Sequence, residues 1–403
     1  MARDILALVL AGGRVEELSV LTMLRPKAAV PFGGQYRIVD FALTCLMRAD
    51  IERVGVIGLY RPFSLIDHLG IGEPWDMVGR GRGVKILPPY QGEGAVQGYR
   101  GTADALYQNL AYIERYAPSD VLVMSGDHIH GMNLRPLIRQ HRESGADLTM
   151  AVKAVDPDSG HGRFGFAELG AGYEVTDYQE KPAKPRSNLA SLTIYMFKTD
   201  ALVMRLAENH RQGSSFHLSS EVIPRMVESD RVCAYLFDGY WNYARSLNAF
   251  HQANMDLLGE EPLIDLDAWG VRSRRQYRGL GDLPPTLFRG GCSCTEAIVA
   301  RGATIAGSVT RSIIGPNVRI AAGARVAESV LMDDVRLGPD ALVYRAILDK
   351  EVEVASGAHI GRVEAANGAV AVIGKRARIS AGERIAPGAA VVPGATGCEE
   401  GRS

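Results

Sequence analysis

A pair of glycines near the start of the chain has the spacing of a phosphate-binding loop. Gly12 and Gly13 follow an apolar run at Ile5–Leu10, and the basic residues Arg25 and Lys27 come shortly afterwards. Backbone N–H groups of a glycine loop can approach phosphate oxygens because no Cβ stands in the way. A lone glycine pair is more often an ordinary turn after a strand. The neighbouring polar residues must therefore decide between the two interpretations.

Asp127 is the first of these polar residues. It follows the apolar run Asp120–Met124 after Ser125 and Gly126. An aspartate after a strand is commonly a turn former. Beside a glycine loop, however, its carboxylate is suited to hold a divalent cation that bridges phosphates. Asp127 is therefore a candidate metal ligand.

Two further segments carry groups suited to a nucleotide or a sugar phosphate. Gly101 and Thr102 open a helical stretch, where backbone N–H groups can face an anion, although Thr102 could equally be a plain helix N-cap. Glu180 and Lys181 precede another apolar run. The lysine could hold a phosphate as a point charge, and the glutamate could accept hydrogen bonds from sugar hydroxyls. By itself this pair would be a solvated loop.

The elements that would position these residues alternate between apolar runs and amphipathic stretches up to about residue 250. This alternation predicts an α/β domain with a mainly parallel sheet covered by helices. Ligands bind such sheets beyond the C-terminal ends of the strands, where Gly12, Gly13 and Asp127 all fall. The expected strands are Ile5–Leu10, Arg53–Gly58, Asp120–Met124, Asp147–Lys153 and Leu192–Phe197, and the expected helices are Ile38–Ala49, Ala103–Glu114 and Leu134–Ser144.

The last quarter of the chain carries a six-residue periodicity. Branched apolar residues recur in steps of 6, 6 and 5, so one turn of the pattern takes 17 residues. This is the hexapeptide signature of a β-helix with three short faces per coil. The alternative, a β-sandwich, fixes no six-residue step. The aligned positions are Ile314, Ile320 and Val326, then Leu331, Leu337 and Val343, then Leu348, Val354 and Ile360, and after an interruption Ile373, Ile379, Ile385 and Val391.

We therefore expect three parts: an α/β domain over residues 1–250, a linker over 251–295, and a β-helix over 296–397. The 403-residue chain is 46% apolar and has a formal net charge of -1, which gives no reason to expect nucleic acid or a membrane as a partner. It has no apolar stretch of the roughly 18 residues that a membrane span needs, and we expect no signal peptide. Its five cysteines form no disulfide framework. These features favour a cytoplasmic protein.

Taken together, the motifs resemble those of one family, the ADP-glucose pyrophosphorylases (glucose-1-phosphate adenylyltransferases). The matching text is LALVLAGGR, RPKAAVPFGGQYRIVDFAL, YRGTADALYQNL, SGDHIHGMN, YQEKPAKP, LASLTIYMF, LPPTLF and the hexapeptide tail. The resemblance implies a Rossmann-like nucleotidyltransferase domain, a left-handed β-helix and a homotetramer. It implies that ATP and glucose 1-phosphate give ADP-glucose and pyrophosphate, in glycogen or α-glucan synthesis. It also implies Mg²⁺ as cofactor and an allosteric metabolite effector.

The resemblance also implies roles for residues at matching positions. Asp127, Lys27 and Lys181 would carry catalysis, with Asp127 holding Mg²⁺ and Lys27 at a phosphate or effector contact. The nucleotide-binding residues would be Gly12, Gly13, Gln91, Gly101 and Thr102. The sugar-phosphate-binding residues would be Tyr99, Gly165, Glu180, Lys181, Ser191, Tyr195 and Trp241.

Three stretches depart from the pattern of this family. Its loop usually reads Gly-Gly-x-Gly-x-Arg-Leu, whereas Val15 replaces a glycine here and Glu17 replaces the arginine expected to meet the triphosphate. Its Trp-x-Asp-Val-Gly segment reads Trp-Asn-Tyr-Ala-Arg, so Tyr243 stands where the second metal-binding carboxylate is expected. The segment 217–220 reads His-Leu-Ser-Ser where the family has His-Asp-Phe-Gly.

These departures leave more than one class of function open. In an active nucleotidyltransferase for glucose 1-phosphate or another sugar phosphate, Arg14 or Arg245 could supply the missing cation, or Glu16 or Glu17 the missing carboxylate. A non-catalytic regulatory subunit in a mixed tetramer with a family paralogue is the second possibility. A hexapeptide-repeat acyltransferase would need a histidine between coils. His359 alone lies in that region of the sequence, and such a histidine is more often a surface residue.

Overall fold

The computed structural model describes residues 4–58, 60–89, 98–156, 162–274, 282–362 and 368–396. The chain divides into two compact units whose segments alternate along the sequence. The first unit comprises Met1–Gly12, Phe41–Pro62 and Leu69–Trp241, and the second comprises Gly13–Asp40, Phe63–His68 and Asn242–Ser403. None of the described helices combines the length and the apolar composition needed to cross a lipid bilayer.

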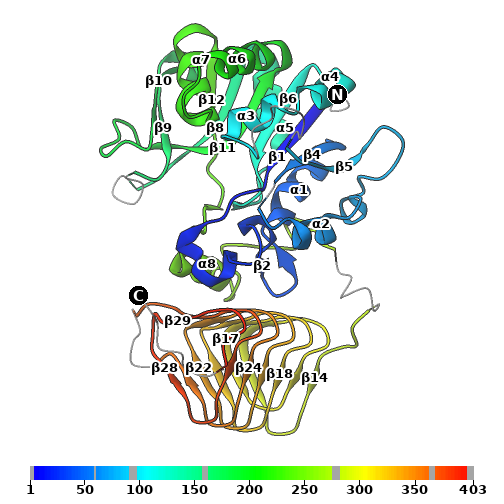
Figure 1. Ribbon diagram of the computed structural model, residues 1–403, viewed down its shortest axis with the longest axis vertical. Helices are drawn as coiled ribbons and strands as arrows, with labels where there is room; N and C mark the ends of the chain where they lie inside the picture. Colours follow the sequence, from blue (N-terminus) through cyan, green and yellow to red (C-terminus); the bar gives the residue numbers. More distant parts are fainter. Residues whose placement is uncertain are drawn as a thin grey trace. The chain divides into compact units, whose positions relative to one another are not determined.

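A nine-stranded sheet forms the centre of the first unit (Figure 1). Its central strand β1 (Ile5–Leu10) pairs in parallel with β4 (Arg53–Ile57) on one side and β6 (Asp120–Ser125) on the other. β5 (Gly83–Leu87) extends the sheet in parallel beyond β4. The side chains of β1 and β6 are almost all buried, as expected for strands covered on both faces. The mainly parallel α/β sheet predicted from the sequence is confirmed.

The other half of this sheet is built around the long strand β11 (Leu189–Lys198). It runs antiparallel to β6 and to β8 (Leu148–Ala154), and β12 (Val232–Leu236) pairs in parallel with β8. The antiparallel pair β9 (Gly165–Leu169) and β10 (Val175–Glu180) completes the sheet beside β11. These strands position several of the candidate sugar-phosphate residues.

Helices pack on the sheet and share its apolar core, which includes Leu106, Leu202 and Ile223. The α-helices in the described part of the chain are α1 (Val39–Arg48), α2 (Phe63–Leu69), α3 (Thr102–Tyr107), α4 (Leu110–Tyr116), α5 (Leu134–Ser144), α6 (Thr199–Gln212), α7 (Ile223–Ser229) and α8 (Leu247–Met255). The short 3₁₀ helices are η1 (Glu16–Thr22), η2 (Lys27–Ala29), η3 (Glu73–Trp75) and η5 (Ala171–Tyr173). A π-helical turn forms η6 (Leu218–Val222).

The single helix expected over Ala103–Glu114 is broken into α3 and α4. The buried Asn109 lies at the break, and its side-chain N–H₂ donates to the Ala105 carbonyl at 2.8 Å and to the Tyr99 hydroxyl at 3.1 Å. Asparagine side chains of this kind compete with the helical hydrogen bonds of the backbone. The prediction of one continuous helix was therefore wrong at this point.

The second unit contains a parallel β-helix, drawn from yellow to red in Figure 1. Ile314, Leu331, Leu348 and Ile373 lie opposite one another on successive strands. The other two predicted series, beginning at Ile320 and Val326, are aligned in the same way. All three series belong to one buried core. The 17-residue hexapeptide pattern is therefore confirmed as the stacking period of the coils.

The strands of the β-helix are mostly two or three residues long. They are β14 (Leu287–Phe288), β15 (Ser293–Val299), β16 (Thr304–Ile305), β17 (Ser308–Ile314), β18 (Arg319–Ile320), β19 (Arg325–Ala327), β20 (Val330–Leu331), β21 (Arg336–Leu337), β22 (Leu342–Tyr344), β23 (Ala346–Leu348), β24 (Glu353–Val354), β25 (His359–Ile360), β26 (Ala371–Ile373), β27 (Arg378–Ile379), β28 (Arg384–Ile385) and β29 (Ala390–Val391). Outside the β-helix and the large sheet lie β2 (Pro31–Phe32), β3 (Tyr36–Arg37), β7 (Ile129–His130) and β13 (Trp241–Asn242).

Candidate active site

Asp127 lies just beyond the C-terminal end of β6, in the first unit. Gly126 makes the turn possible, because a Cβ there would lie 2.7 Å from the Val9 side chain. The Ser125 hydroxyl donates a hydrogen bond to Asp127, and Nε2 of His128 lies 3.5 Å from the same carboxylate. The Asp127 side chain remains 20% exposed. Its carboxylate is thus held in one orientation and is still accessible from outside the protein.

The neighbouring Trp241 fixes the protonation pattern of His128. The indole Nε1–H donates to Nδ1 of His128 at 3.2 Å. An indole nitrogen can only donate, so Nδ1 accepts and the ring proton of a neutral His128 is on Nε2. That proton faces Asp127, which lets the histidine orient the carboxylate without a change in charge.

The residues around Asp127 fit a magnesium ion shared with a substrate. No group of three or more histidine, cysteine, aspartate or glutamate side chains in the described residues could hold a metal by itself. Mg²⁺ is commonly bound by only one or two carboxylates, with substrate phosphates and water completing its coordination. One accessible carboxylate at a sheet edge fits that donor set. The assignment of Mg²⁺ to Asp127 stays a prediction.

A second cluster joins three of the expected sugar-phosphate residues with Tyr178. The Ser191 and Tyr195 hydroxyls are 2.9 Å apart, and the Tyr178 hydroxyl donates to Oε2 of Glu180 at 2.9 Å. Burial raises the pKa of the Tyr195 phenol to about 12. Burial and the neighbouring Tyr195 and Glu180 raise the pKa of Tyr178 well above its ordinary value. Both phenols therefore stay protonated and able to donate at neutral pH.

Gly165 makes room for this cluster. A Cβ at this position would lie 1.9 Å from the Tyr178 hydroxyl and 2.9 Å from Oε2 of Glu180. Tyr178 itself was missed by the sequence reasoning. The signal that could have found it is the period-two alternation of β10, which places residues 178 and 180 on the same face of the strand.

Lys181 and Trp241 lie next to the two clusters. Lys181 has a left-handed backbone with φ of 47°, and its N–H donates to the Phe164 carbonyl at 3.0 Å. The Phe164 and Trp241 rings meet edge to face with centroids 5.2 Å apart. The Lys181 side chain is 53% exposed, and its ammonium lies 3.7 Å from Glu180. Trp241 therefore contacts His128, beside Asp127, as well as Phe164, beside Lys181.

The start of α3 is braced by the loop before η6. The Phe216 carbonyl accepts from the N–H groups of Ala103 and Asp104 at 2.8 and 3.3 Å, and Thr102 Oγ1 accepts from the Leu218 N–H at 2.8 Å. A Cβ on Gly101 would lie 2.3 Å from the Phe216 oxygen. The expectation of unoccupied N–H donors at this helix start was wrong, because these two donors are used within the protein. The nucleotide-binding roles of Gly101 and Thr102 stay predictions.

The remaining candidates in this unit are also placed. The Tyr99 hydroxyl donates to the Leu87 carbonyl at 3.0 Å and accepts from Asn109, so it has a structural role on the edge of the sheet. Burial raises its pKa. Gln91 lies outside the described residues.

In the second unit, the glycine loop carries a cluster of four polar side chains. Arg245 Nε lies 2.8 Å from Glu17 Oε1, and Arg245 Nη1 donates to the Tyr243 hydroxyl at 3.3 Å. Lys27 is only 1% exposed. Its ammonium donates to the Tyr243 carbonyl and lies 4.2 Å from the centre of that ring. Its backbone N–H donates to the Gly13 carbonyl at 3.4 Å.

Sequence comparisons identify the family to which these sites belong. A family model described as nucleotidyl transferase matches residues 6–260, and a GlmU-like, C-terminal hexapeptide model matches residues 289–385. The chain is 39% identical over 363 residues to a glucose-1-phosphate adenylyltransferase of Thermomicrobium roseum. That alignment covers 89% of this chain and 83% of the relative. The chain belongs to the glucose-1-phosphate adenylyltransferase family. Relatives of the same name from Acetivibrio thermocellus and Bacillus licheniformis are 36% and 40% identical, and the alignments cover 89% and 79% of this chain and 84% of each relative.

The departures from the family pattern fall into two places in the structure. Val15 is buried, and its carbonyl accepts from the Thr22 hydroxyl at 2.6 Å, so an apolar anchor replaces a flexible glycine. Glu17 and Tyr243 both contact Arg245, as described above. A hydrogen bond from its own backbone N–H, together with the Arg245 guanidinium, lowers the pKa of Glu17. Leu218, which is buried at the start of η6, stands where the family has an aspartate.

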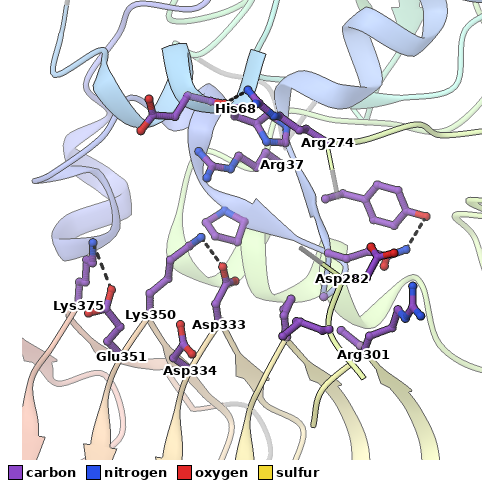
Figure 2. Close-up of a pocket in the computed structure, with 18 residues that line it drawn as sticks. Arg37, His68, Arg274, Asp282, Arg301, Asp333, Asp334, Lys350, Glu351 and Lys375 are labelled. Atoms are coloured by element: carbon purple, nitrogen blue, oxygen red, sulfur yellow. Dashed lines mark hydrogen bonds and ion pairs between the residues drawn. The ribbon is translucent and has the colours of Figure 1, made fainter. Parts of the chain in front are cut away.

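The second unit also contains a pocket of about 630 Å³. Lys350 pairs with Asp333, and Lys375 pairs with Glu351 at 3.6 Å (Figure 2). Burial and the nearby cations Arg37 and Arg25 lower the pKa of Lys350, which Asp333 partly offsets. The lining residues are Pro31, Gly34, Gln35, Tyr36, Arg37, Asp67, His68, Arg274, Asp282, Leu283, Ala300, Arg301, Pro316, Asp333, Asp334, Lys350, Glu351 and Lys375.

Proposed function

We propose that this chain is a glucose-1-phosphate adenylyltransferase, which converts ATP and α-D-glucose 1-phosphate to ADP-glucose and pyrophosphate for α-glucan synthesis. The observation that carries the proposal is the cluster of Glu180, Lys181, Ser191 and Tyr195, linked through Trp241 to Asp127 within one compact unit. An oxygen of the sugar phosphate attacks the α-phosphorus of ATP in line. The new P–O bond forms as the bond to pyrophosphate breaks.

Catalysis of this kind rests on positioning and on neutralising charge, with little covalent chemistry by the protein. Mg²⁺ held by Asp127 would neutralise charge on the phosphate oxygens. Ser125 and His128 keep the Asp127 carboxylate aimed in one direction. Lys181 would place its positive charge on the sugar phosphate, and Glu180, oriented by Tyr178, would accept from a sugar hydroxyl.

A substrate panel tests this proposal. The purified protein is supplied with each of four nucleoside triphosphates and with glucose 1-phosphate, mannose 1-phosphate or N-acetylglucosamine 1-phosphate, and the nucleotide sugar is identified by chromatography. We expect ADP-glucose as the main product. A different nucleotide sugar would contradict the proposed substrates and would favour a relative with another sugar preference, for which Leu218 is the relevant sequence departure.

Glu17, which stands on the phosphate loop where the family has an arginine, favours a second function, a non-catalytic subunit of a mixed tetramer. An anionic side chain on the phosphate loop repels a triphosphate unless a cation or metal compensates it. If the chain is regulatory, pyrophosphate release is absent with the protein alone, and the protein changes the effector response of a co-expressed active paralogue. Turnover by the chain alone would contradict this alternative.

The pocket of the second unit supports the proposal of an allosteric metabolite effector. Five arginine and lysine side chains line the pocket beside five carboxylates, and these cations could bind an anionic ligand such as a phosphorylated metabolite. We expect Lys350→Met to abolish the response to such an effector and to leave basal turnover unchanged. A retained response would contradict this site.

The β-helix supports the proposal of a homotetramer or mixed tetramer. Its first strands, β14 and β15, each pair with a strand on one side only among the described residues, and Leu287 and Phe288 on β14 are 45% and 51% exposed. Exposed apolar strand edges are suited to subunit contacts. Light scattering on the purified protein tests this, and a monomer at micromolar concentration would contradict it.

The proposed reaction would take place in the cytoplasm.

A further inference from the structure

The glycine loop carries more negative than positive charge close to where a nucleotide triphosphate would bind. Residues 14–17 include Glu16 and Glu17 but a single cation, Arg14. Lys27 is 1% exposed and its ammonium is bonded to the Tyr243 carbonyl. Arg245 reaches the loop from outside it, and its Nε lies 2.8 Å from Glu17 Oε1.

The ion pair between Arg245 and Glu17 can be broken at little cost, so that Arg245 can bind another anion instead. The two side chains are 37% and 50% exposed, and exposed ion pairs contribute little to stability. Arg245 also donates to the Tyr243 hydroxyl at 3.3 Å, and its guanidinium carbon lies 5.6 Å from the centre of that ring. Tyr243 can therefore keep the guanidinium beside the loop when Glu17 releases it.

A guanidinium is well matched to phosphate. It presents five N–H donors in a planar fork, stays charged at all physiological pH values, and binds phosphate oxygens in pairs. A triphosphate carries several negative charges, whereas Glu17 carries one. Phosphate therefore competes effectively for Arg245 once a nucleotide reaches the loop.

We propose that Arg245 is a phosphate-binding residue for the nucleotide, supplied to the loop from the segment after Trp241, and that Glu17 holds it there until the nucleotide displaces the carboxylate. The proposal rests on the proposed function, because it requires ATP as a ligand. It assigns Arg245 a phosphate-binding role in addition to the loop's own cation, Arg14.

The test is calorimetric titration of the full-length protein with ATP and Mg²⁺, without glucose 1-phosphate. Arg245→Gln should weaken ATP binding by about tenfold to a hundredfold, the usual effect of losing a charge-assisted hydrogen bond. Glu17→Gln should tighten it, by up to about fivefold. Arg135→Gln is the matched control, because Arg135 forms an exposed pair with Asp50 at 2.6 Å and should leave ATP binding unchanged.

The double variant Glu17→Gln/Arg245→Gln shows whether Arg245 binds the phosphate groups of ATP or only neutralises the charge of Glu17. If Arg245 binds phosphate, the double variant stays weaker than Glu17→Gln by at least about tenfold. If Arg245 only neutralises Glu17, the double variant binds as tightly as Glu17→Gln, and the proposal is overturned. If the unsubstituted protein does not bind ATP, the proposed function fails and this inference fails with it. If the protein binds ATP and Arg245→Gln binds it equally well, the inference alone fails.

Discussion

The phenol of Tyr178 donates a 2.9 Å hydrogen bond to Oε2 of Glu180, across two residues of one strand. Tyr178 is 7% exposed, so the bond is shielded from water and fixes one carboxylate oxygen. The other oxygen, Oε1, faces Lys181 at 3.7 Å. Tyr178 is thus a positioning residue for Glu180, since it orients the group that we expect to bind the sugar.

Removing this hydroxyl should impair sugar binding more than turnover. We expect Tyr178→Phe to raise the KM for glucose 1-phosphate by about tenfold or more, because a hydrogen bond to a charged group is lost, with kcat changed much less. Steady-state kinetics measures both parameters. Tyr173→Phe is the matched control, since Tyr173 is 53% exposed. An unchanged KM in Tyr178→Phe would show that Glu180 needs no such support.

We expect Glu221 to make the stability of the fold, at the loop before η6, fall at acid pH. Burial opposes its ionisation, but hydrogen bonds from Ser215, Ser214 and Asn209 outweigh this and hold the pKa of Glu221 well below its ordinary value. A carboxylate with a depressed pKa stabilises the fold above its unfolded-state pKa, and this contribution is lost as the pH falls through the folded-state pKa.

The corresponding variant is Glu221→Gln. At pH 7 we expect it to lower the free energy of unfolding by about 1–3 kcal/mol, the cost of weakening several charge-assisted hydrogen bonds. The difference from the unsubstituted protein should shrink as the pH falls below about 4, as measured by urea unfolding at several pH values. Glu228→Gln on the exposed face of α7 is the control. A difference that does not depend on pH would contradict the role given to the Glu221 charge.

A buried ion pair joins the segment after the glycine loop to the β-helix, within the second unit. Arg25 Nη1 and Nη2 donate to both oxygens of Asp349 at 2.9 and 2.7 Å, and the two side chains are 5% and 1% exposed. We expect Arg25→Met to destabilise the protein by about 3–5 kcal/mol, because Asp349 is left buried and unpaired. Thermal and urea unfolding measure this loss.

The double variant Arg25→Met/Asp349→Leu removes both charges and should restore most of the lost stability, as replacement of buried ion pairs by apolar groups commonly does. For comparison, Arg135→Met breaks an exposed pair and should cost no more than about 1 kcal/mol. A double variant as unstable as Arg25→Met would show that packing around Arg25 matters more than its charge.

The repeating parts of the fold were predictable from the sequence, and the contacts between distant residues were not. The period of 17 predicted that Ile320, Leu337 and Val354 stack, because one side chain per face must fill the coil interior. The strand that delivers Asp127 was predicted by its apolar run. The pair between Arg25 and Asp349 spans 324 residues and leaves no periodic signal.

The same limit applies to the candidate site. A short polar motif predicted Glu180, and the family resemblance implied Gly165 and Trp241; the structure places them next to partners that these patterns do not contain. Phe216 occupies the N–H groups at the start of α3 because a loop more than a hundred residues later folds back onto Gly101. The departure at Glu17 was visible in the sequence, but its partner Arg245 was one of several cations that could have met it.

The most direct test of the proposed reaction is pyrophosphate release by the purified protein with ATP, glucose 1-phosphate and Mg²⁺, beside Asp127→Asn. The matched control is Asp50→Asn, whose side chain is 71% exposed and paired with Arg135. We predict steady release that Asp127→Asn reduces to background and Asp50→Asn leaves intact. No release by the unsubstituted protein, with ATP binding preserved, would contradict the proposed catalysis and favour the regulatory subunit.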